Sequence, residues 1–334
     1  MSNIVLKDLS FTYPGTDVAV IDQLNLQIAD GEAHALLGAS GSGKTTLLNL
    51  LSGILVPSHG QILFADKDVS QLPGVSRGIA QVFQFPVLYP SVSVEQNLRL
   101  PAANLGFAES EISSRLGFIS TQLEVGGLLG KKISDLSLYQ KQLVAVAKAL
   151  MRPDVSVVLL DEPLTAVEPK LKWQLRQALL TVREQLGITM VYVTHDQTEA
   201  LTFADRVSVV SEQGILQTDS PQNIYETPAH TYVGYFVGSP GMNILRRNPD
   251  NPDAEFGFRP EWAELQAAGE MELQGTVVAN KAEGSAQGQI FGLTQVQLQS
   301  DHKVYVRGPI NFEEGEQVGL AVHKRVEFER GWRV

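Results

Sequence analysis

Apolar and polar residues alternate in two early segments of the chain, residues 4–9 and residues 23–28. Alternation with a period of two is typical of strands that bury one face. Between these segments, Tyr13-Pro14-Gly15 has the composition of a turn. The pattern therefore predicts a small antiparallel sheet at the start of the chain.

A short, continuous apolar run at residues 33–37 leads directly into a glycine-rich segment, residues 38–46. Leucines at positions 47, 48, 50 and 51 then recur with helical spacing. Strand, glycine loop and helix, in this order, are what a phosphate-binding site requires. From about residue 93 to residue 150 the pattern is mostly helical, which predicts a helical insertion.

Two further apolar runs, residues 155–160 and 188–193, are rich in β-branched residues and leucine. Such runs are typical of strands that are covered on both faces. Between them, apolar residues recur at helical spacing from Leu171 to Leu186. Helices that alternate with buried strands predict an α/β fold with a parallel sheet and crossover connections.

The composition changes after residues 238–241. A loop-like run at 248–253 is followed by short alternating strands that glycines interrupt. We predict a first domain over residues 1–240, with its helical part at about 85–150, and a β-rich second domain over 241–334. The length of 334 residues agrees, because single cores rarely grow to that size.

The composition also limits the class of protein. With 43% hydrophobic and 19% charged residues, the chain is expected to fold into a globular structure. The net charge of -11 opposes binding to nucleic acid, so we expect no nucleic-acid partner. The chain has no cysteine, which excludes disulfides and thiolate metal sites and suits a reducing compartment.

Charged residues interrupt every apolar run near the amino terminus, so no signal peptide is expected; they include Lys7, Asp8, Asp17 and Asp22. The longest apolar runs are the length of a strand, far below the roughly 20 residues that span a bilayer. We therefore expect a cytoplasmic protein, in which any membrane role depends on a partner.

The glycine-rich segment fits the pattern GxxxxGK[ST]. Glycines let backbone N–H groups curl around phosphates, and the following helix directs its positive end at the same charge. Lys44 is expected to neutralise phosphate oxygens, and Thr45 to offer its hydroxyl to Mg²⁺. A flexible glycine-serine loop, the alternative, would not require Lys and Thr there. The expected nucleotide-binding residues are Gly38, Ser40, Gly41, Ser42, Gly43, Lys44, Thr45 and Thr46.

Acidic residues and a histidine follow the two later apolar runs. Asp161, at the end of the first run, is expected to help hold Mg²⁺, and Glu162 to poise the attacking water. His195 follows the next strand and should emerge at the same sheet edge, within reach of the γ-phosphate or the water. For the two acids, the alternative is a solvated turn at the end of a strand. For His195, the alternative is a histidine with only a structural role. The five other histidines are interpreted as ordinary polar residues.

The order of these motifs resembles that of ABC transporter nucleotide-binding subunits, particularly the importer ATPases of the maltose and glycerol-phosphate type. Residues 38–46 match the Walker A motif, residues 157–163 the extended Walker B motif, and residues 192–200 the switch-histidine segment. Residues 225–228 and 236–243 resemble the linker to a regulatory domain. The resemblance implies a P-loop NTPase core with antiparallel β and helical subdomains, and a C-terminal OB-like domain of the TOBE type.

The same resemblance assigns two further residues and the partners. Tyr13 would stack on adenine, unless it is only a turn tyrosine, and Gln84 would join the catalytic core to the helical subdomain and sense Mg²⁺. ATP and Mg²⁺ are the implied cofactors. Transmembrane permease subunits are the implied partners, with a periplasmic or extracellular solute-binding protein as an indirect one. The chain would then lie at the cytoplasmic face of the membrane.

The chain departs from the family at the LSGGQ signature, where it has Leu136-Ser137-Leu138-Tyr139-Gln140. In the family this segment reaches across a dimer to the nucleotide of the other subunit, which makes Ser137 and Gln140 candidate binding residues. Added Cβ atoms threaten that approach. Glu168 also replaces the usual aspartate of the D-loop. Because a signature acts on the partner's site, the hypothesis is a heterodimer with a second ATPase, as in glycerol importers, although a homodimer stays possible.

The leading interpretation is an ATP-hydrolysing importer subunit that powers uptake of a small carbohydrate or polyol, such as glycerol or glycerol phosphate. One alternative is a soluble ABC ATPase outside transport, and another is a regulatory subunit that binds ATP without hydrolysing it. A P-loop kinase is disfavoured because it explains neither the helical insertion nor the β-rich domain. The transported substrate contacts other chains, so this sequence does not identify it.

Overall fold

The computed structural model describes the chain except for residues 1–2, 165–166, 213, 249–250, 270 and 287–288. The chain divides into two compact units, Met1–Pro221 and Gln222–Val334. The predicted domain boundary after residue 240 falls inside the second of these units. The short helix α8 (Thr231–Phe236) therefore belongs to the second unit.

A six-stranded sheet is the centre of the first unit, in the order β10-β9-β3-β8-β7-β6. All neighbouring strands are parallel except the antiparallel pair β9 and β10. The predicted parallel sheet is thus confirmed, and its apolar runs are buried because helices cover them. The strands are β3 (Ala33–Leu37), β6 (Ile79–Val82), β7 (Val157–Asp161), β8 (Thr189–Thr194), β9 (Arg206–Ser211) and β10 (Gly214–Asp219).

Three helices directly follow strands of this sheet: α1 (Lys44–Ser52) follows β3, α5 (Pro169–Leu186) follows β7 and α6 (Gln197–Phe203) follows β8. Helix α1 contacts β6, β7 and β8, and α6 contacts β3 and β8. Helix α5 connects β7 to β8, as the crossover prediction requires. It ends at Gly187, whose left-handed backbone terminates the helix.

The predicted antiparallel sheet at the start of the chain is present, in the order β2-β1-β4-β5. Its inward residues share one apolar cluster with the leucines of α1, which joins this sheet to the glycine-loop helix. The strands are longer than the alternating runs, since pairing continues past them. They are β1 (Ile4–Thr12), β2 (Ala19–Ile28), β4 (His59–Phe64) and β5 (Lys67–Asp68).

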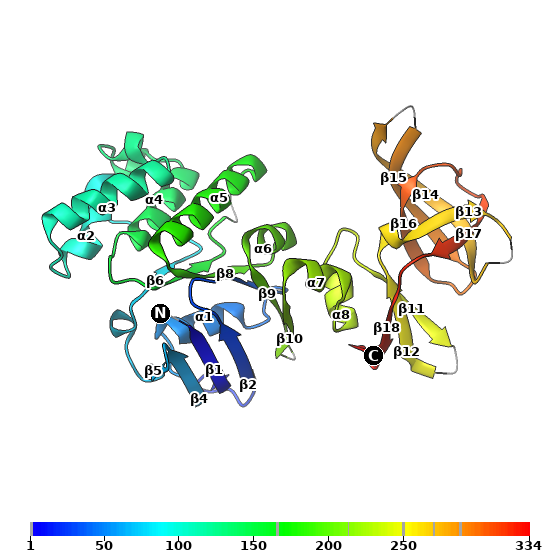
Figure 1. Cartoon of the computed structure of the whole chain (residues 1–334), viewed down its shortest axis with the longest axis horizontal. Helices are drawn as coiled ribbons and strands as arrows, with labels where there is room; N and C mark the ends of the chain where they lie inside the picture. Colours follow the sequence, from blue (N-terminus) through cyan, green and yellow to red (C-terminus); the bar gives the residue numbers. More distant parts are fainter. Residues whose placement is uncertain (1–2, 165–166, 213, 249–250, 270, 287–288) are drawn as a thin grey trace. The chain divides into compact units, whose positions relative to one another are not determined.

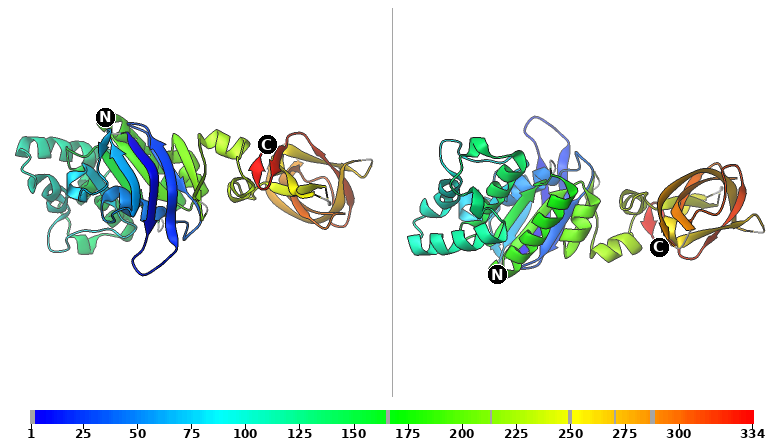
Figure 2. Two further views of the ribbon diagram at one scale, coloured as in Figure 1. Left: turned by 90° about the horizontal axis from the view of Figure 1, so that it is seen from below. Right: turned by 90° about the horizontal axis from the view of Figure 1, so that it is seen from above.

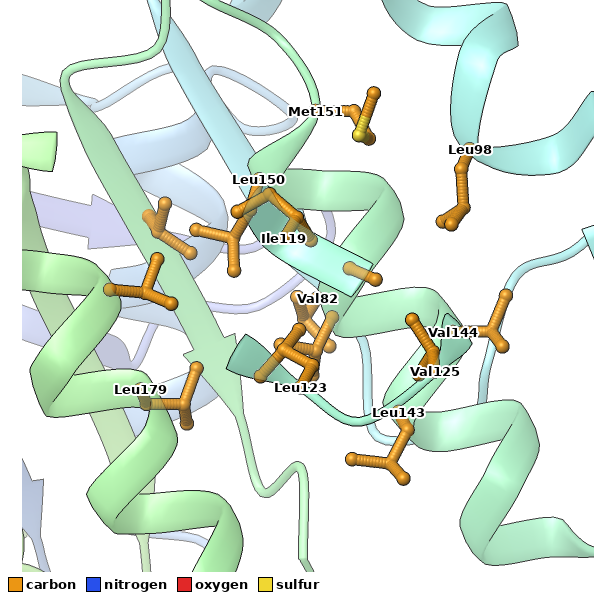
Figure 3. Close-up of a cluster of buried hydrophobic side chains, with 14 of the residues drawn as sticks. Val82, Leu98, Ile119, Leu123, Val125, Leu143, Val144, Leu150, Met151 and Leu179 are labelled. Atoms are coloured by element: carbon orange, nitrogen blue, oxygen red, sulfur yellow. The ribbon is translucent and has the colours of Figure 1, made fainter. Parts of the chain in front are cut away.

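The helical insertion consists of α2 (Val94–Ala103), α3 (Glu109–Gln122) and α4 (Leu138–Leu150). Figure 1 shows these helices grouped together, apart from β1, β2 and β4. Their apolar faces meet β6 and α5 in one cluster (Figure 3), so the insertion is packed onto the core of the first unit. Members of this cluster include Val82, Leu98, Ile119, Leu123, Val125, Leu143, Val144, Leu150, Met151 and Leu179.

The second unit is rich in strands, as predicted. It has a four-stranded sheet, β11-β12-β18-β19, and a five-stranded sheet, β13-β17-β14-β15-β16. In Figure 2 these strands, yellow to red, curl around a shared interior. Their bounds are β11 (Asn243–Asn248), β12 (Asn251–Phe258), β13 (Ala263–Ala267), β14 (Leu273–Ala286), β15 (Gln289–Leu298), β16 (Lys303–Pro309), β17 (Gln317–Val322), β18 (Val326–Glu329) and β19 (Trp332–Arg333).

One prediction in this unit is wrong. The sequence predicts a loop over residues 248–253, of which 249 and 250 lie outside the described residues, but Asn248 ends β11 and pairs with Asn251, the first residue of β12. Strand β12 also pairs with β18, for example through Ala254 and Glu329. These pairings extend the hairpin in spite of the turn-like composition of the segment, because tertiary context overrides local preference.

Candidate functional site

The glycine-rich loop lies between the end of β3 at Leu37 and the start of α1 at Lys44. Gly41 and Gly43 have φ of 86° and 87°, a left-handed conformation that other residues adopt at a cost. Gly38 is required for another reason, because a Cβ there would lie 2.3 Å from the carbonyl oxygen of Val210. The loop thus runs directly into the positive, amino-terminal end of α1.

The Lys44 side chain is buried within this loop. Its Nζ donates hydrogen bonds to the carbonyl oxygens of Gly38 and Ala39, at 2.9 and 2.7 Å, and to Ser42 Oγ at 3.3 Å. Burial lowers the pKa of Lys44, although the charges of Glu162 and Asp161 oppose this. A cation held among carbonyls can exchange them for the more negative oxygens of a phosphate.

Asp161 is the last residue of β7 and is brought next to the glycine loop. Thr45 Oγ1 donates a hydrogen bond to Asp161 Oδ1 at 3.4 Å. Burial, together with the charge of Glu162, raises the pKa of Asp161. Among the described residues no group of three or more histidines or acids could hold a metal. Mg²⁺ usually takes one or two carboxylates and completes its shell with phosphates and water, so a hydroxyl and a carboxylate here fit it.

Glu162 and His195 form a pair beside Asp161. They follow the adjacent parallel strands β7 and β8, and His195 Nδ1 lies 2.9 Å from Glu162 Oε1. Glu162 has φ of 44°, and its N–H donates to the carbonyl of Val193 at 3.0 Å. The His195 side chain is half exposed, whereas that of Glu162 is mostly covered. A carboxylate held in this way can accept a proton from a water molecule.

Tyr13 lies immediately after β1 and is also brought to the glycine loop. Its hydroxyl is 3.0 Å from Thr46 Oγ1 on the first turn of α1. The ring packs edge-on against Phe11, with centroids 4.9 Å apart. Tyr13 remains 38% exposed, so its side chain is accessible to a ligand at the glycine loop.

Three predicted site residues lie outside this cluster. Gln84 is exposed, two residues after β6, whose end at Val82 pairs with Leu160 of β7. Ser137 and Gln140 cap helix α4: Ser137 Oγ accepts from Gln140 N at 3.2 Å, and Ser137 N donates to Gln140 Oε1 at 3.1 Å. In the D-loop, Thr165 and Ala166 lie outside the described residues, and Glu168 is the exposed residue before α5.

One charged residue near this site, Glu199, could not be recognised from the sequence motifs. Glu199 was included only as part of the switch-histidine segment, yet its side chain is almost fully buried in α6. It accepts a hydrogen bond from Lys172 of α5 at 2.7 Å. The only sequence signal was an acid four residues after His195, which does not indicate burial.

Comparison with known proteins identifies the family. A family model described as ABC transporter matches residues 21–165. The sn-glycerol-3-phosphate import ATP-binding protein UgpC of Rhizobium meliloti (strain 1021) is 40% identical over 274 residues, which cover 78% of this chain and 78% of that protein. The chain belongs to the ABC transporter ATP-binding proteins. The predicted ABC ATPase fold, ATP binding and ATPase activity are therefore confirmed.

Two other proteins show how far the similarity extends. The Diacetylchitobiose uptake system ATP-binding protein MsiK of Streptomyces coelicolor is 38% identical over 257 residues, 77% of this chain and 68% of that protein. The solved structure of cbiO1 from Clostridium perfringens, described as part of the ABC transporter complex cbiONQ, has a TM-score of 0.61 and 30% identity. It covers 66% of this chain and 89% of its own. No helix among the described residues is both long and apolar enough to cross a membrane.

Proposed function

We propose that this ABC ATPase powers the import of a small carbohydrate or polyol, such as glycerol or glycerol phosphate, through permease subunits. It would act at the cytoplasmic face of the membrane, with a solute-binding protein as an indirect partner. Support comes from two relatives, one an ATP-binding protein of sn-glycerol-3-phosphate import and the other of a diacetylchitobiose uptake system. The observation that carries hydrolysis is the contact between Glu162 and His195 beside Asp161.

The residues around the glycine loop have separate roles in this proposal. Lys44 leaves the carbonyls of Gly38 and Ala39 and binds phosphate oxygens, while the loop N–H groups bind the remaining charge. Thr45 and Asp161, with Gln84, would hold Mg²⁺, which neutralises charge on the phosphates when it is bound.

The second group of residues acts on the water. Glu162 orients the attacking water and accepts its proton. His195 holds the Glu162 carboxylate in place through the 2.9 Å contact and presents its other ring nitrogen to the phosphate side. Tyr13 presents its ring to the adenine base, and its hydroxyl is tied to Thr46 at the glycine loop.

Single-turnover hydrolysis in the assembled transporter, where the second ATPase supplies its signature to this chain's ATP, tests the proposed roles of Glu162 and His195. Glu162→Gln and His195→Ala should each slow hydrolysis by about 10²–10⁴-fold, the usual contribution of a positioned base, while Mg-ATP still binds. Glu184→Gln, an exposed acid on α5, is the matched control and should hydrolyse ATP as the wild type does. Wild-type hydrolysis by Glu162→Gln would contradict the assignment.

The altered signature supports a heterodimer. Both Ser137 and Gln140 are engaged in capping their own helix. Leu138, the first residue of α4, is 53% exposed, so an apolar side chain projects where the family has glycine. This chain would therefore serve the other subunit's nucleotide poorly, while its own loop with Lys44 is complete. We infer that a second ATPase contributes an intact signature to this chain's ATP.

The double variant Leu138→Gly/Tyr139→Gly tests the heterodimer inference. It should increase ATP-dependent dimerisation and turnover of the purified chain, measured by light scattering and phosphate release. Each glycine costs about 1 kcal/mol in a helix, so thermal unfolding must confirm that the variant folds. Leu105→Gly, at another exposed leucine, is the control. ATP-dependent homodimers with brisk turnover in the wild-type chain alone would contradict the inference.

Co-purification from membranes tests the partners. Affinity capture of the full chain should recover permease subunits and a second ATPase. The solute-binding protein that belongs with these permeases then indicates the transported compound. Recovery of ribosomes in place of permeases would contradict a role in transport.

A further inference from the structure

A buried polar network includes the residues on both sides of His195. At its centre is Glu199 of α6, whose side chain is 4% exposed. One carboxylate oxygen, Oε2, accepts hydrogen bonds from the Tyr192 hydroxyl at 2.8 Å and from Thr194 Oγ1 at 3.0 Å. The other, Oε1, lies 2.7 Å from Lys172 Nζ. Both carboxylate oxygens thus accept hydrogen bonds, as a buried charge requires.

The network holds the residues on both sides of His195. Thr194, which precedes it, donates to Glu199 and accepts from the N–H of Asp196 at 2.9 Å. Asp196, which follows it, caps α6 by accepting from the N–H of Glu199 at 3.2 Å, and lies 3.5 Å from Lys172 Nζ. The backbone that carries His195 is therefore anchored to Glu199 at both neighbouring residues.

Lys172 connects this network to another part of the fold. It lies in the first turn of α5, where its N–H donates to the carbonyl of Glu168 at 2.9 Å. Burial lowers its pKa, but the hydrogen bond and charge of Glu199, with the charge of Asp196, outweigh burial and raise the pKa of Lys172. Lys172 thus stays charged, and the ion pair joins the start of α5 to the His195 loop.

We propose that Glu199, paired with Lys172, is a positioning residue that sets the place of His195 against Glu162. This inference rests on the proposed role of His195 in hydrolysis. Loss of the ion pair lets the segment 194–196 shift, and the imidazole then leaves the geometry in which it contacts the Glu162 carboxylate. Hydrolysis slows, whereas Mg-ATP binding, which depends on the glycine loop, changes little.

Single-turnover hydrolysis, measured in the complex with the second ATPase and the permeases, and calorimetry on the purified chain test this proposal together. Lys172→Met and Glu199→Gln should slow hydrolysis about tenfold to a hundredfold, since a displacement of about 1 Å has effects of this size, with the Kd for Mg-ATP changed less than about twofold. Lys172→Arg should keep near wild-type rates because it preserves the charge. Lys170→Met, an exposed lysine two residues earlier on α5, is the matched control. If Lys172→Met does not fold, the double variant Lys172→Met/Glu199→Gln, which removes both charges of the ion pair, takes its place.

A double-mutant cycle separates positioning from general structural damage. In a His195→Ala background, Lys172→Met should slow hydrolysis by less than about twofold more, because residues that act through one group are not additive. If Lys172→Met slows the reaction as strongly without His195 as with it, the proposal is overturned.

An imidazole resonance reports the position of His195 without any hydrolysis. The His195 cross-peak, assigned by its absence from His195→Ala, should move in Lys172→Met and Glu199→Gln but not in Lys170→Met. An unmoved cross-peak overturns the proposal. If the cross-peak moves but His195→Ala hydrolyses ATP normally, the positioning holds and the proposed catalytic role of His195 fails.

Discussion

Gly38 offers a direct test of how the glycine loop is built. An alanine Cβ at this position would lie 2.3 Å from the carbonyl oxygen of Val210, about 1 Å closer than an ordinary contact. The opposing atom is backbone of β9, which cannot rotate away as a side chain does. Overpacking of this kind costs about 1–3 kcal/mol, and the rigid neighbour places Gly38→Ala at about 3 kcal/mol.

Gly41→Ala is the matched comparison within the same loop. Nothing lies within 4 Å of its added Cβ, so only the left-handed backbone, with φ of 86°, opposes the change. That strain costs about 1–2 kcal/mol, and the lower entropy of the unfolded alanine chain offsets about half of it. We expect a loss of about 1 kcal/mol.

Urea unfolding of the nucleotide-free chain measures both effects. The urea midpoint of the first unit should fall further for Gly38→Ala than for Gly41→Ala. With the dependence of the free energy of unfolding on urea concentration unchanged, this difference corresponds to about 2 kcal/mol in the free energy of unfolding. Equal losses, or a larger loss for Gly41→Ala, would refute the close approach between the loop and β9.

Three further substitutions test the electrostatics of the fold. Burial and the charge of Glu162 raise the pKa of Asp161, so the Asp161 carboxylate destabilises the nucleotide-free fold. Asp161→Asn should therefore raise the urea midpoint at pH 7, and this difference from the wild type should disappear below about pH 4, where Asp161 is protonated in both the folded and the unfolded chain. The same variant should lower Mg²⁺-dependent phosphate release. His34→Phe leaves the buried Glu32 carboxylate without its 2.6 Å partner and should lower the free energy of unfolding by about 3 kcal/mol while Mg-ATP binding is kept; a loss below about 1 kcal/mol would count against the pair. Arg259→Met removes the donor to the backbone carbonyls of Tyr225, Gly234 and Val237 and should lower the melting temperature of the second unit, whereas an unchanged melting temperature would contradict that role.

The main elements of the site could be predicted because local patterns encode them. The loop from Gly38 to Thr45 follows an apolar strand and precedes leucines at helical spacing, so its place in the fold is readable from the sequence. Asp161 ends one buried strand and His195 directly follows another, and the carboxyl ends of parallel strands meet at one edge. The adjacency of β7 and β8 then brings Glu162 and His195 together.

Other features depend on contacts between distant segments. Glu199 is buried because α5 places Lys172 against α6, and no local pattern distinguishes it from an exposed helical acid. The hairpin at Asn248 and Asn251 has the composition of a loop, yet pairing with β18 makes its second half a strand. The sequence motif names Gln84 as a ligand, but ligation at an exposed loop position depends on the nucleotide, so Gln84 stays a prediction.

Isothermal titration calorimetry with Mg-ATP tests the central claim that the loop around Lys44 binds the terminal phosphates. The wild-type chain should bind Mg-ATP, with weaker binding when Mg²⁺ is withheld. Lys44→Ala should abolish or strongly weaken binding, while Lys170→Ala, an exposed lysine on α5, should bind as the wild type does. Unchanged Mg-ATP uptake by Lys44→Ala, or none by the wild type, would contradict the account.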